Sequence, residues 1–264
     1  MSERKIGINK NCINIPNAEA IRLMAENGFS ATFADSEDES LERYISLCRD
    51  AGIACETLHA PYDRINDMWF EGDAGESMLE RLINALETCA RFEVPTAIVH
   101  LSSGDDAPRI NDLGYSRYAA LMKRADSLGV TVAYENQRKL ANLAFAFEVF
   151  PTARFCWDTG HEACFARGLR FMPLFGDKLC ALHIHDNNGE HNADLHMLPF
   201  DGKLDFDAIA GYLAKSSYTG TLMLEVIAGK TPLYLPMTPG EYYARAASAA
   251  SLLCDMIDAA AKTL

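Results

Sequence analysis

Short apolar segments alternate with longer amphipathic ones along the chain, and this alternation limits the fold more than any other feature of the sequence. Eight segments are typical of buried strands, and they occupy residues 5–10, 31–35, 53–60, 96–101, 130–135, 153–158, 179–185 and 220–226. Helical patterns lie between them, for instance over residues 18–28, which end on Gly28, and over residues 76–92. The chain therefore reads as eight β-then-α units.

Repeated β-then-α units imply a parallel sheet, and the chain length decides which kind of sheet forms. Eight units in 264 residues predict a closed (β/α)₈ TIM barrel of the α/β class, for which about 250 residues is typical. No GxGxxG stretch follows the first strand, as an open dinucleotide-binding sheet would need. No Pro-, Gly- or Ser-rich stretch and no run of charges divides the chain, so residues 1–264 are predicted to form a single domain.

Side chains that bind metals or carry protons stand at the carboxyl ends of six consecutive predicted strands, where such barrels place their chemistry. In chain order they are His59, His100, Glu135, Asp158 with His161 close behind, His183 with His185, and Glu225. In the stretch CALHIHD, His183 and His185 alternate with aliphatic residues, so both histidines face the same side of the strand. The pattern predicts a metal site at the top of the barrel.

Each of these residues also has a simple structural explanation. A single histidine at a strand end is usually a packed, hydrogen-bonded residue, and Glu135 or Asp158 alone would cap the following helix. Three converging carboxylates would repel one another, however, and each is costly to desolvate without a counter-charge. A cation among them removes both costs, which favours the metal site.

Two loops add further candidates. The loop after the seventh strand carries Asp194 and His196, which belong either to the substrate or a second metal, or to a solvated acidic loop, and Asp186 is expected to brace that loop. The loop after the third strand carries Trp69 amid polar residues. Trp69 would serve as a lid over the substrate or as an anchor of the loop on the barrel rim, and the lid is the hypothesis adopted.

Charge and targeting patterns narrow the partners. The formal net charge is −13 and the basic residues near the strand ends are scattered, which disfavours binding to nucleic acid or to an anionic membrane. The amino terminus is charged where a signal peptide would be apolar, and no window approaches the about 18 apolar residues of a membrane span, so we expect a cytoplasmic protein. The eight cysteines include no CxxC pair and are expected to be reduced.

The strand-end motifs HAPYD, VHLSSG, YENQ, DTGH, HIHDNNG, the DxH pair and LEV, in this order, resemble those of the xylose isomerase-like TIM-barrel superfamily. This superfamily includes sugar and sugar-phosphate isomerases and epimerases, hydroxypyruvate isomerase, inosose dehydratase, and the endonuclease IV family of abasic-site nucleases. The resemblance covers essentially the whole chain. It is specific to the superfamily and not to one activity.

In the isomerase and epimerase branch, the resemblance implies one divalent metal ion. Its ligands would be Glu135, Asp158, His183 and Glu225. His183 is preferred to the alternative His185 because the family ligand stands three residues before the Asp of an HxxD-like pattern, and Asp186 fixes that count. His161 resembles the histidine that contacts the substrate.

In the nuclease branch, three zinc ions use nine ligands, and the resemblance offers a match for each. The matching residues are His59, His100, Glu135, Asp158, His161, His183, Asp194, His196 and Glu225. The top loops contain no run of basic residues with which to grip a DNA backbone. A zinc-dependent abasic-site nuclease is therefore the alternative function.

The function expected from the resemblance is a metal-dependent sugar or sugar-phosphate isomerase or epimerase. The ion would polarise a substrate carbonyl, while Glu135 and Glu225 remove and return a proton at the next carbon through a metal-stabilised enediolate. Loss of a β-hydroxyl instead would make the enzyme a dehydratase of the inosose dehydratase kind. Mn²⁺, Zn²⁺, Mg²⁺ and Co²⁺ all suit the ligands. The expected partner is a small carbohydrate, whose identity the sequence leaves open. The sequence also leaves open whether the protein forms a homo-oligomer.

Overall fold

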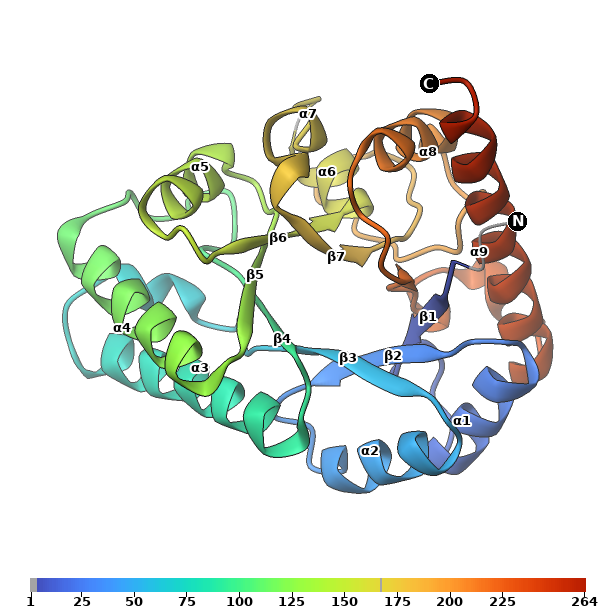
Figure 1. Cartoon of the computed structure of the whole chain (residues 1–264), viewed down its shortest axis with the longest axis horizontal. Coiled ribbons are helices and arrows are strands. Elements are labelled where there is room, and N and C mark those ends of the chain that lie inside the picture. Colours follow the sequence, from blue (N-terminus) through green and yellow to red (C-terminus); the bar gives the residue numbers. More distant parts are fainter. Residues whose placement is uncertain (1–3, 167) are drawn as a thin grey trace.

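Parallel strands form a ring surrounded by helices in the computed structural model, which describes residues 4–166 and 168–264 (Figure 1). Within these residues the strands are β1 (Ile6–Asn9), β2 (Ala31–Asp35), β3 (Ala54–His59), β4 (Thr96–Val99), β5 (Thr131–Glu135), β6 (Arg154–Asp158), β7 (Leu179–His183) and β8 (Leu222–Leu224). They lie in the order β7-β6-β5-β4-β3-β2-β1-β8. The (β/α)₈ barrel predicted from the sequence is thereby confirmed.

The ring closes between β7 and β8 through a short pairing just beyond β7. Ile184 and Leu224 form a parallel bridge. The backbone N of Ile184 donates to the carbonyl of Met223 at 2.9 Å, and the backbone N of Glu225 donates to the carbonyl of Ile184 at 3.0 Å. The other neighbouring strands in the described part of the chain pair over three residues or more. Closure therefore depends on few backbone hydrogen bonds, and they lie level with His183 and Glu225.

The helices follow the strands, and capping residues mark some of their ends. They are α1 (Asn17–Glu26), α2 (Leu41–Asp50), α3 (Asp73–Phe92), α4 (Asp112–Leu128), α5 (Leu140–Val149), α6 (Thr159–Phe165), α7 (Met172–Phe175), α8 (Phe206–Lys215) and α9 (Pro239–Ala261), with 3₁₀ helices η1 (Ile65–Trp69), η2 (Gly176–Lys178), η3 (Ala228–Lys230) and η4 (Pro232–Tyr234). Thr238 and Glu241 form a capping box at the start of α9. Gly28 has φ +79° just after α1, as expected for a glycine that ends a helix.

Strand alternation separates two cores. Large side chains such as Leu58, Tyr134 and Trp157 are buried in the main cluster, together with residues of the surrounding helices. The barrel interior instead holds small clusters. One consists of Ile98, Ala133, Cys156 and Ala181, and another of Ala31, Phe33 and Met223. Apolar side chains of mixed size therefore form the layer beneath the strand ends, and the ligand-type residues stand above them.

Several finer expectations can be compared with the structure. All eight cysteines are free thiols. The seventh strand ends at His183 and the eighth at Leu224, slightly earlier than expected, although the Ile184–Leu224 bridge continues the pairing. Asp186 braces its loop, as expected, by accepting hydrogen bonds from the backbone N of Asn187, Gly202 and Leu204. No helix in the described ranges is long and apolar enough to cross a bilayer.

Candidate active site

Four ligand-type side chains from neighbouring strands converge at the carboxyl end of the barrel. Glu135, Asp158 and His183 end β5, β6 and β7, and Glu225 follows β8. One ligand atom from each lies within 4.8 Å of the others. Nδ1 of His183 lies 3.2 Å from Oε2 of Glu225 and also contacts Oε1 of Glu135. The structure thus brings together the four residues assigned to one metal ion from the sequence.

Glu135 also reaches two further histidines. Nε2 of His59 lies 3.6 Å from Oε2 of Glu135, and Nε2 of His100 contacts the same oxygen. Nδ1 of His59 is 2.8 Å from the carbonyl oxygen of Ala60. When Nδ1 donates its proton to this carbonyl, Nε2 is left to bind a cation. His59, His100 and Glu135 form a second group of donor atoms within 4.8 Å of one another.

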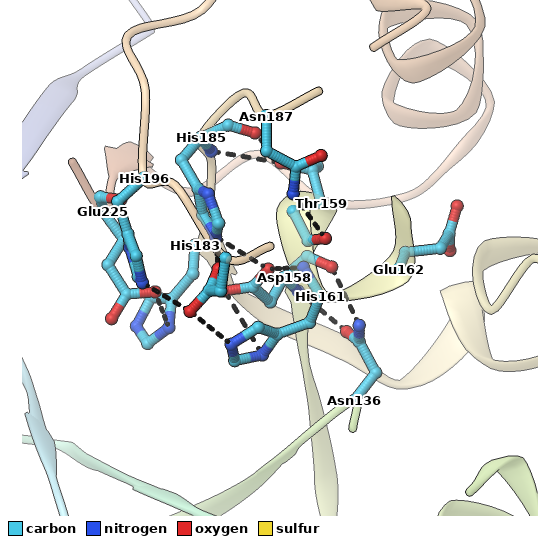
Figure 2. A network of polar contacts seen from close by, with 12 residues as sticks. Asn136, Asp158, Thr159, His161, Glu162, His183, His185, Asn187, His196 and Glu225 are labelled. Carbon is cyan, nitrogen blue, oxygen red and sulfur yellow. Dashed lines mark hydrogen bonds and ion pairs between the residues drawn. The ribbon is translucent and has the colours of Figure 1, made fainter. Parts of the chain in front are cut away.

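The start of α6 holds Asp158 and His185 in place (Figure 2). Asp158 caps the helix, because its Oδ1 accepts a hydrogen bond of 2.6 Å from the backbone N of His161. Nε2 of His185 lies 3.1 and 3.2 Å from the two carboxylate oxygens of Asp158. Thr159 bonds the backbone N and O of His185 through its hydroxyl. A Cβ on Gly160 would lie 1.9 Å from Cε1 of His185, so only glycine leaves room for this ring.

Asp194 and His196, from the loop after β7, complete the other side of the site. Oδ2 of Asp194 lies 2.8 Å from Nε2 of His196 and 3.7 Å from Nε2 of His161. The His196 ring stacks on the His185 ring with centroids 4.2 Å apart. His185, Asp194 and His196 are a third group of donor atoms within 4.8 Å of one another. The structure therefore places both loop residues inside the site and not in a solvated loop.

The buried charges of these groups shift one another's pKa values. Burial alone would raise the pKa of Glu135, but the positive charge of His183 and the contact with His100 lower it well below its usual range. Burial also opposes a charge on His161, yet Asp158, Asp194 and Glu135 raise its pKa to about 10. The pKa of Asp194 is lowered, against the effect of burial, by hydrogen bonds from His161 and His196. Protonated histidines thus balance the carboxylates, a task that a metal ion also performs.

A cavity of about 420 Å³ opens over these groups. Its lining includes the sequence candidates His59, His100, Glu135, His161, Asp194, His196 and Glu225. Asp158, His183 and His185 lie behind this lining and are at most 1% exposed. A small molecule in this cavity would therefore lie against the ligand-type residues.

Sequence reasoning missed several residues of the site. Nε2 of Gln137 lies 2.9 Å from Nδ1 of His161, and Gln137 lines the cavity. The side chain of Asn136 bonds both the backbone N and the carbonyl O of Asp158, each at 2.8 Å. Asp35 and Tyr62 also line the cavity. The signal for Asn136 and Gln137 was present, because both directly follow the strand-end Glu135 in the motif YENQ.

Trp69 does not form the lid adopted from the sequence. Its side chain is 2% exposed, and Nε1 donates a 2.7 Å hydrogen bond to the carbonyl of Leu101. The ring packs near Tyr118 and Phe145, and it is not among the described residues that line the cavity. Burial of a large indole with a satisfied N–H is more favourable than its exposure, so Trp69 takes the anchoring role.

The donor set fits a divalent metal ion. Oδ1 of Asp194 and Nε2 of His183 are buried atoms without a hydrogen-bond partner among residues 4–166 and 168–264. Buried polar atoms are normally satisfied. Carboxylate oxygens combined with imidazole nitrogens suit Mn²⁺, Co²⁺ or Zn²⁺. Glu135, Asp158, His183 and Glu225 are the residues that would hold the ion.

Replacing Asp158 with Asn is expected to remove the metal while the barrel stays folded. Asn keeps the oxygen that caps α6 but loses the negative charge. Metal affinity should fall by more than the roughly 10–100-fold that loss of an outer-shell partner costs, and elemental analysis of the purified protein measures this. Asp205→Asn is the matched control, because Asp205 caps α8 through the backbone N of Ala208 at 3.0 Å. Unchanged metal content in Asp158→Asn would show that the ligand is wrongly assigned.

The sequence matches known families and proteins over most of its length. A model of the family described as "Xylose isomerase-like TIM barrel" matches residues 17–252. The uncharacterized protein y4fM of Sinorhizobium fredii is 28% identical over an alignment of 273 positions, and the match covers 89% of this chain and 84% of that protein.

Solved structures with the same fold include sugar epimerases. A D-psicose 3-epimerase from Clostridium cellulolyticum, solved with D-tagatose, has a TM-score of 0.77 at 15% identity, covering 96% of this chain and 99% of that one. The 3-keto-D-glucoside 4-epimerase YcjR from E. coli has a TM-score of 0.73 at 19% identity, covering 96% and 100%. At these identities the likeness establishes the shared fold.

Proposed function

The chain belongs to the xylose isomerase-like TIM-barrel family, and from this we propose that it is a sugar epimerase or isomerase that depends on a divalent metal ion. The observation that carries the proposal is the pair of carboxylates, Glu135 and Glu225, that line one cavity and converge with Asp158 and His183. Epimerases of D-psicose and of 3-keto-D-glucosides are among the proteins that share its fold, which supports the choice of reaction.

The proposed chemistry moves one proton next to a carbonyl. A bound divalent ion supplies Lewis acidity that makes the neighbouring C–H more acidic. One of the two carboxylates, Glu135 or Glu225, takes the proton to give an enediolate, and the other returns it. Return to the other face of the same carbon gives epimerisation, and return to the neighbouring carbon gives an aldose–ketose exchange. His161 lines the cavity with a raised pKa, so it stands as a hydrogen-bond donor to substrate oxygens.

We further propose that the substrate carries no phosphate. Two of the basic residues that line the cavity are already paired: Lys10 contacts Asp38, and Nε of Arg138 lies 3.2 Å from Asp105. Lys230 remains as an exposed cation at the rim. A phosphate would therefore meet little unpaired positive charge, whereas the cavity volume of about 420 Å³ and its many polar side chains suit a monosaccharide or a small glycoside.

Solvent deuterium tests the proposal. The metal-loaded protein is incubated in D₂O with a panel of ketoses, ketoglycosides and their phosphates, and products are analysed by NMR and mass spectrometry. We expect deuterium at the carbon next to the carbonyl in the product of an unphosphorylated sugar. Efficient conversion without any solvent deuterium would reject the two-carboxylate mechanism, and turnover confined to phosphates would reject the substrate class.

A second candidate, a zinc-dependent abasic-site nuclease, is favoured by one observation. Beside the proposed metal site, the described residues contain two further donor groups made of histidines and carboxylates alone: His59, His100 and Glu135 on one side, and His185, Asp194 and His196 on the other. The net charge of −13 argues against a DNA partner. Three zinc ions per chain together with catalytic nicking of an abasic duplex would establish the nuclease, whereas one ion per chain and no nicking would support the epimerase.

A further inference from the structure

A thiol lies directly beneath the metal-ligand residues. Cys156 and Asp158 lie two residues apart on β6, so strand alternation turns both into the barrel. In the strand registers Cys156 pairs with Glu135 of β5 and with Ala181 of β7. Cys156 thereby stands one layer below the ligand residues and next to the strand that carries Glu135.

The surroundings leave the thiol open toward the metal site. Its own cluster consists of Ile98, Ala133, Cys156 and Ala181, in which Cys156 is the one member of the described chain with a side-chain heteroatom. The two alanines are too short to separate it from the layer above. The sulfur of Cys156 and one ligand atom each of Glu135 and His183 lie within 4.8 Å of one another, and all three residues are buried.

His183 connects the two layers. Its Nδ1 contacts Glu135, and one of its ring nitrogens lies within 4.8 Å of the Cys156 sulfur. Its Nε2 is buried and has no oxygen or nitrogen partner in the described part of the chain. A histidine that binds a metal normally gives its other nitrogen to an outer partner. Near His183 the neighbouring group is a thiol, which unlike a carbonyl is itself a strong metal ligand.

We propose that Glu135, Cys156 and His183 form a second, lower position for a thiophilic divalent ion such as Zn²⁺, Co²⁺ or Cd²⁺. One oxygen, one sulfur and one nitrogen are the donors that these ions favour, whereas Mn²⁺ and Mg²⁺ favour the oxygen-rich position above. Binding replaces the S–H proton by the ion and releases that proton to solvent. Because Glu135 and His183 belong to both positions, an ion in the lower position competes with the ion in the upper one.

The test uses purified protein and metal salts, without any sugar, so its outcome is independent of the proposed function. Co²⁺ added to the metal-free protein should produce a sulfur-to-cobalt charge-transfer band in the near ultraviolet. The band should be absent from Cys156→Ala and from the volume-conserving Cys156→Ser. Cys89→Ala is the matched control, because Cys89 is also a buried free thiol but lies on α3, and it should keep the band.

Competition gives a second readout. Cd²⁺ should displace Mn²⁺ from the wild-type protein, and the electron paramagnetic resonance signal of the released Mn²⁺ measures this displacement. In Cys156→Ala, the same displacement should need at least about tenfold more Cd²⁺. Binding of Co²⁺ to the wild type without a charge-transfer band would overturn the proposal, as would a band that survives in Cys156→Ala. If Cys156→Ala weakened the binding of Mn²⁺ and of Cd²⁺ by the same factor, Cys156 would only support His183. That result would also overturn the proposal.

Discussion

Glu225→Gln is expected to lower turnover by about 10²–10⁴-fold while most of the bound metal is retained, the range typical for loss of a general acid or base. The amide keeps the size of the side chain and one oxygen, but it cannot take up a proton. Oε2 of Glu225 lies 3.2 Å from Nδ1 of His183, and the pKa of Glu225 is lowered, against the effect of burial, by the charge of His183. Glu225 is therefore an ionised carboxylate at neutral pH, as the proposed role of a base requires.

Glu56→Gln provides the matched control for this substitution. Glu56 lies near the amino end of β3, at the opposite end of the barrel, where Oε1 accepts a hydrogen bond from the hydroxyl of Thr221 at 2.8 Å. The Glu56→Gln variant should keep its turnover within about twofold of the wild type. The measurement is kcat with the sugar identified by deuterium exchange, together with metal content. If Glu225→Gln kept its metal and turned over as fast as Glu56→Gln, Glu225 would not be a proton carrier.

Gly160→Ala is expected to have the largest effect on stability. The added Cβ would lie 1.9 Å from Cε1 and 2.3 Å from Nδ1 of His185, and that ring has nowhere to move. It is stacked on His196, and its Nε2 is bonded to Asp158. Overpacking of this kind costs about 1–3 kcal/mol, or roughly 2–4 °C in Tm per kcal/mol for a chain of this size. The displaced ring should also disturb Asp158 and weaken metal binding.

Gly211→Ala is the control for Gly160→Ala. Gly211 lies within α8, and a Cβ there would meet none of the described atoms within 4 Å. Alanine in the interior of a helix should stabilise the protein by roughly 0.5–1 kcal/mol. Thermal unfolding, measured by circular dichroism, should therefore show a lower Tm for Gly160→Ala and a higher Tm for Gly211→Ala than for the wild type. A Gly160→Ala protein as stable as the wild type, with undiminished metal content, would show that His185 is not confined as described.

The barrel was predictable because its signals are local. Each strand is a short apolar run bounded by polar or turn residues, and each motif stands where a strand ends, so eight strands and their ends follow from the sequence. The lengths of β7 and β8 did not follow, because pairing across the closure depends on residues 40 positions apart in the chain. Trp69 was misplaced for a similar reason. Its loop is polar, and nothing nearby in sequence indicates the distant partner Leu101.

The sequence predicted which residues gather at the candidate site, but not which of them contact one another. Alternation correctly turns His183 and His185 to the same side of the barrel. It does not indicate that His183 meets Glu135 and Glu225 whereas His185 meets Asp158 and Asp194. That division depends on how far each strand is shifted against its neighbour, and the register of β6 against β7 shifts between Phe155 and Cys156. The position of Cys156 under Glu135 and His183 was hidden for the same reason.

The short closure between β7 and β8 implies a structural role for the proposed metal site. The two sides of this seam are held by the bridge between Ile184 and Leu224, and His183 and Glu225 stand on either side of it. An ion bound by both would act as a cross-link across the weakest lateral joint of the barrel. At a free ion concentration of 100 times the dissociation constant, binding would contribute about 2.7 kcal/mol to the free energy of unfolding. Removal of a bound ion would therefore weaken the joint between β7 and β8, so that stability against unfolding and the proposed metal-dependent activity would be lost together.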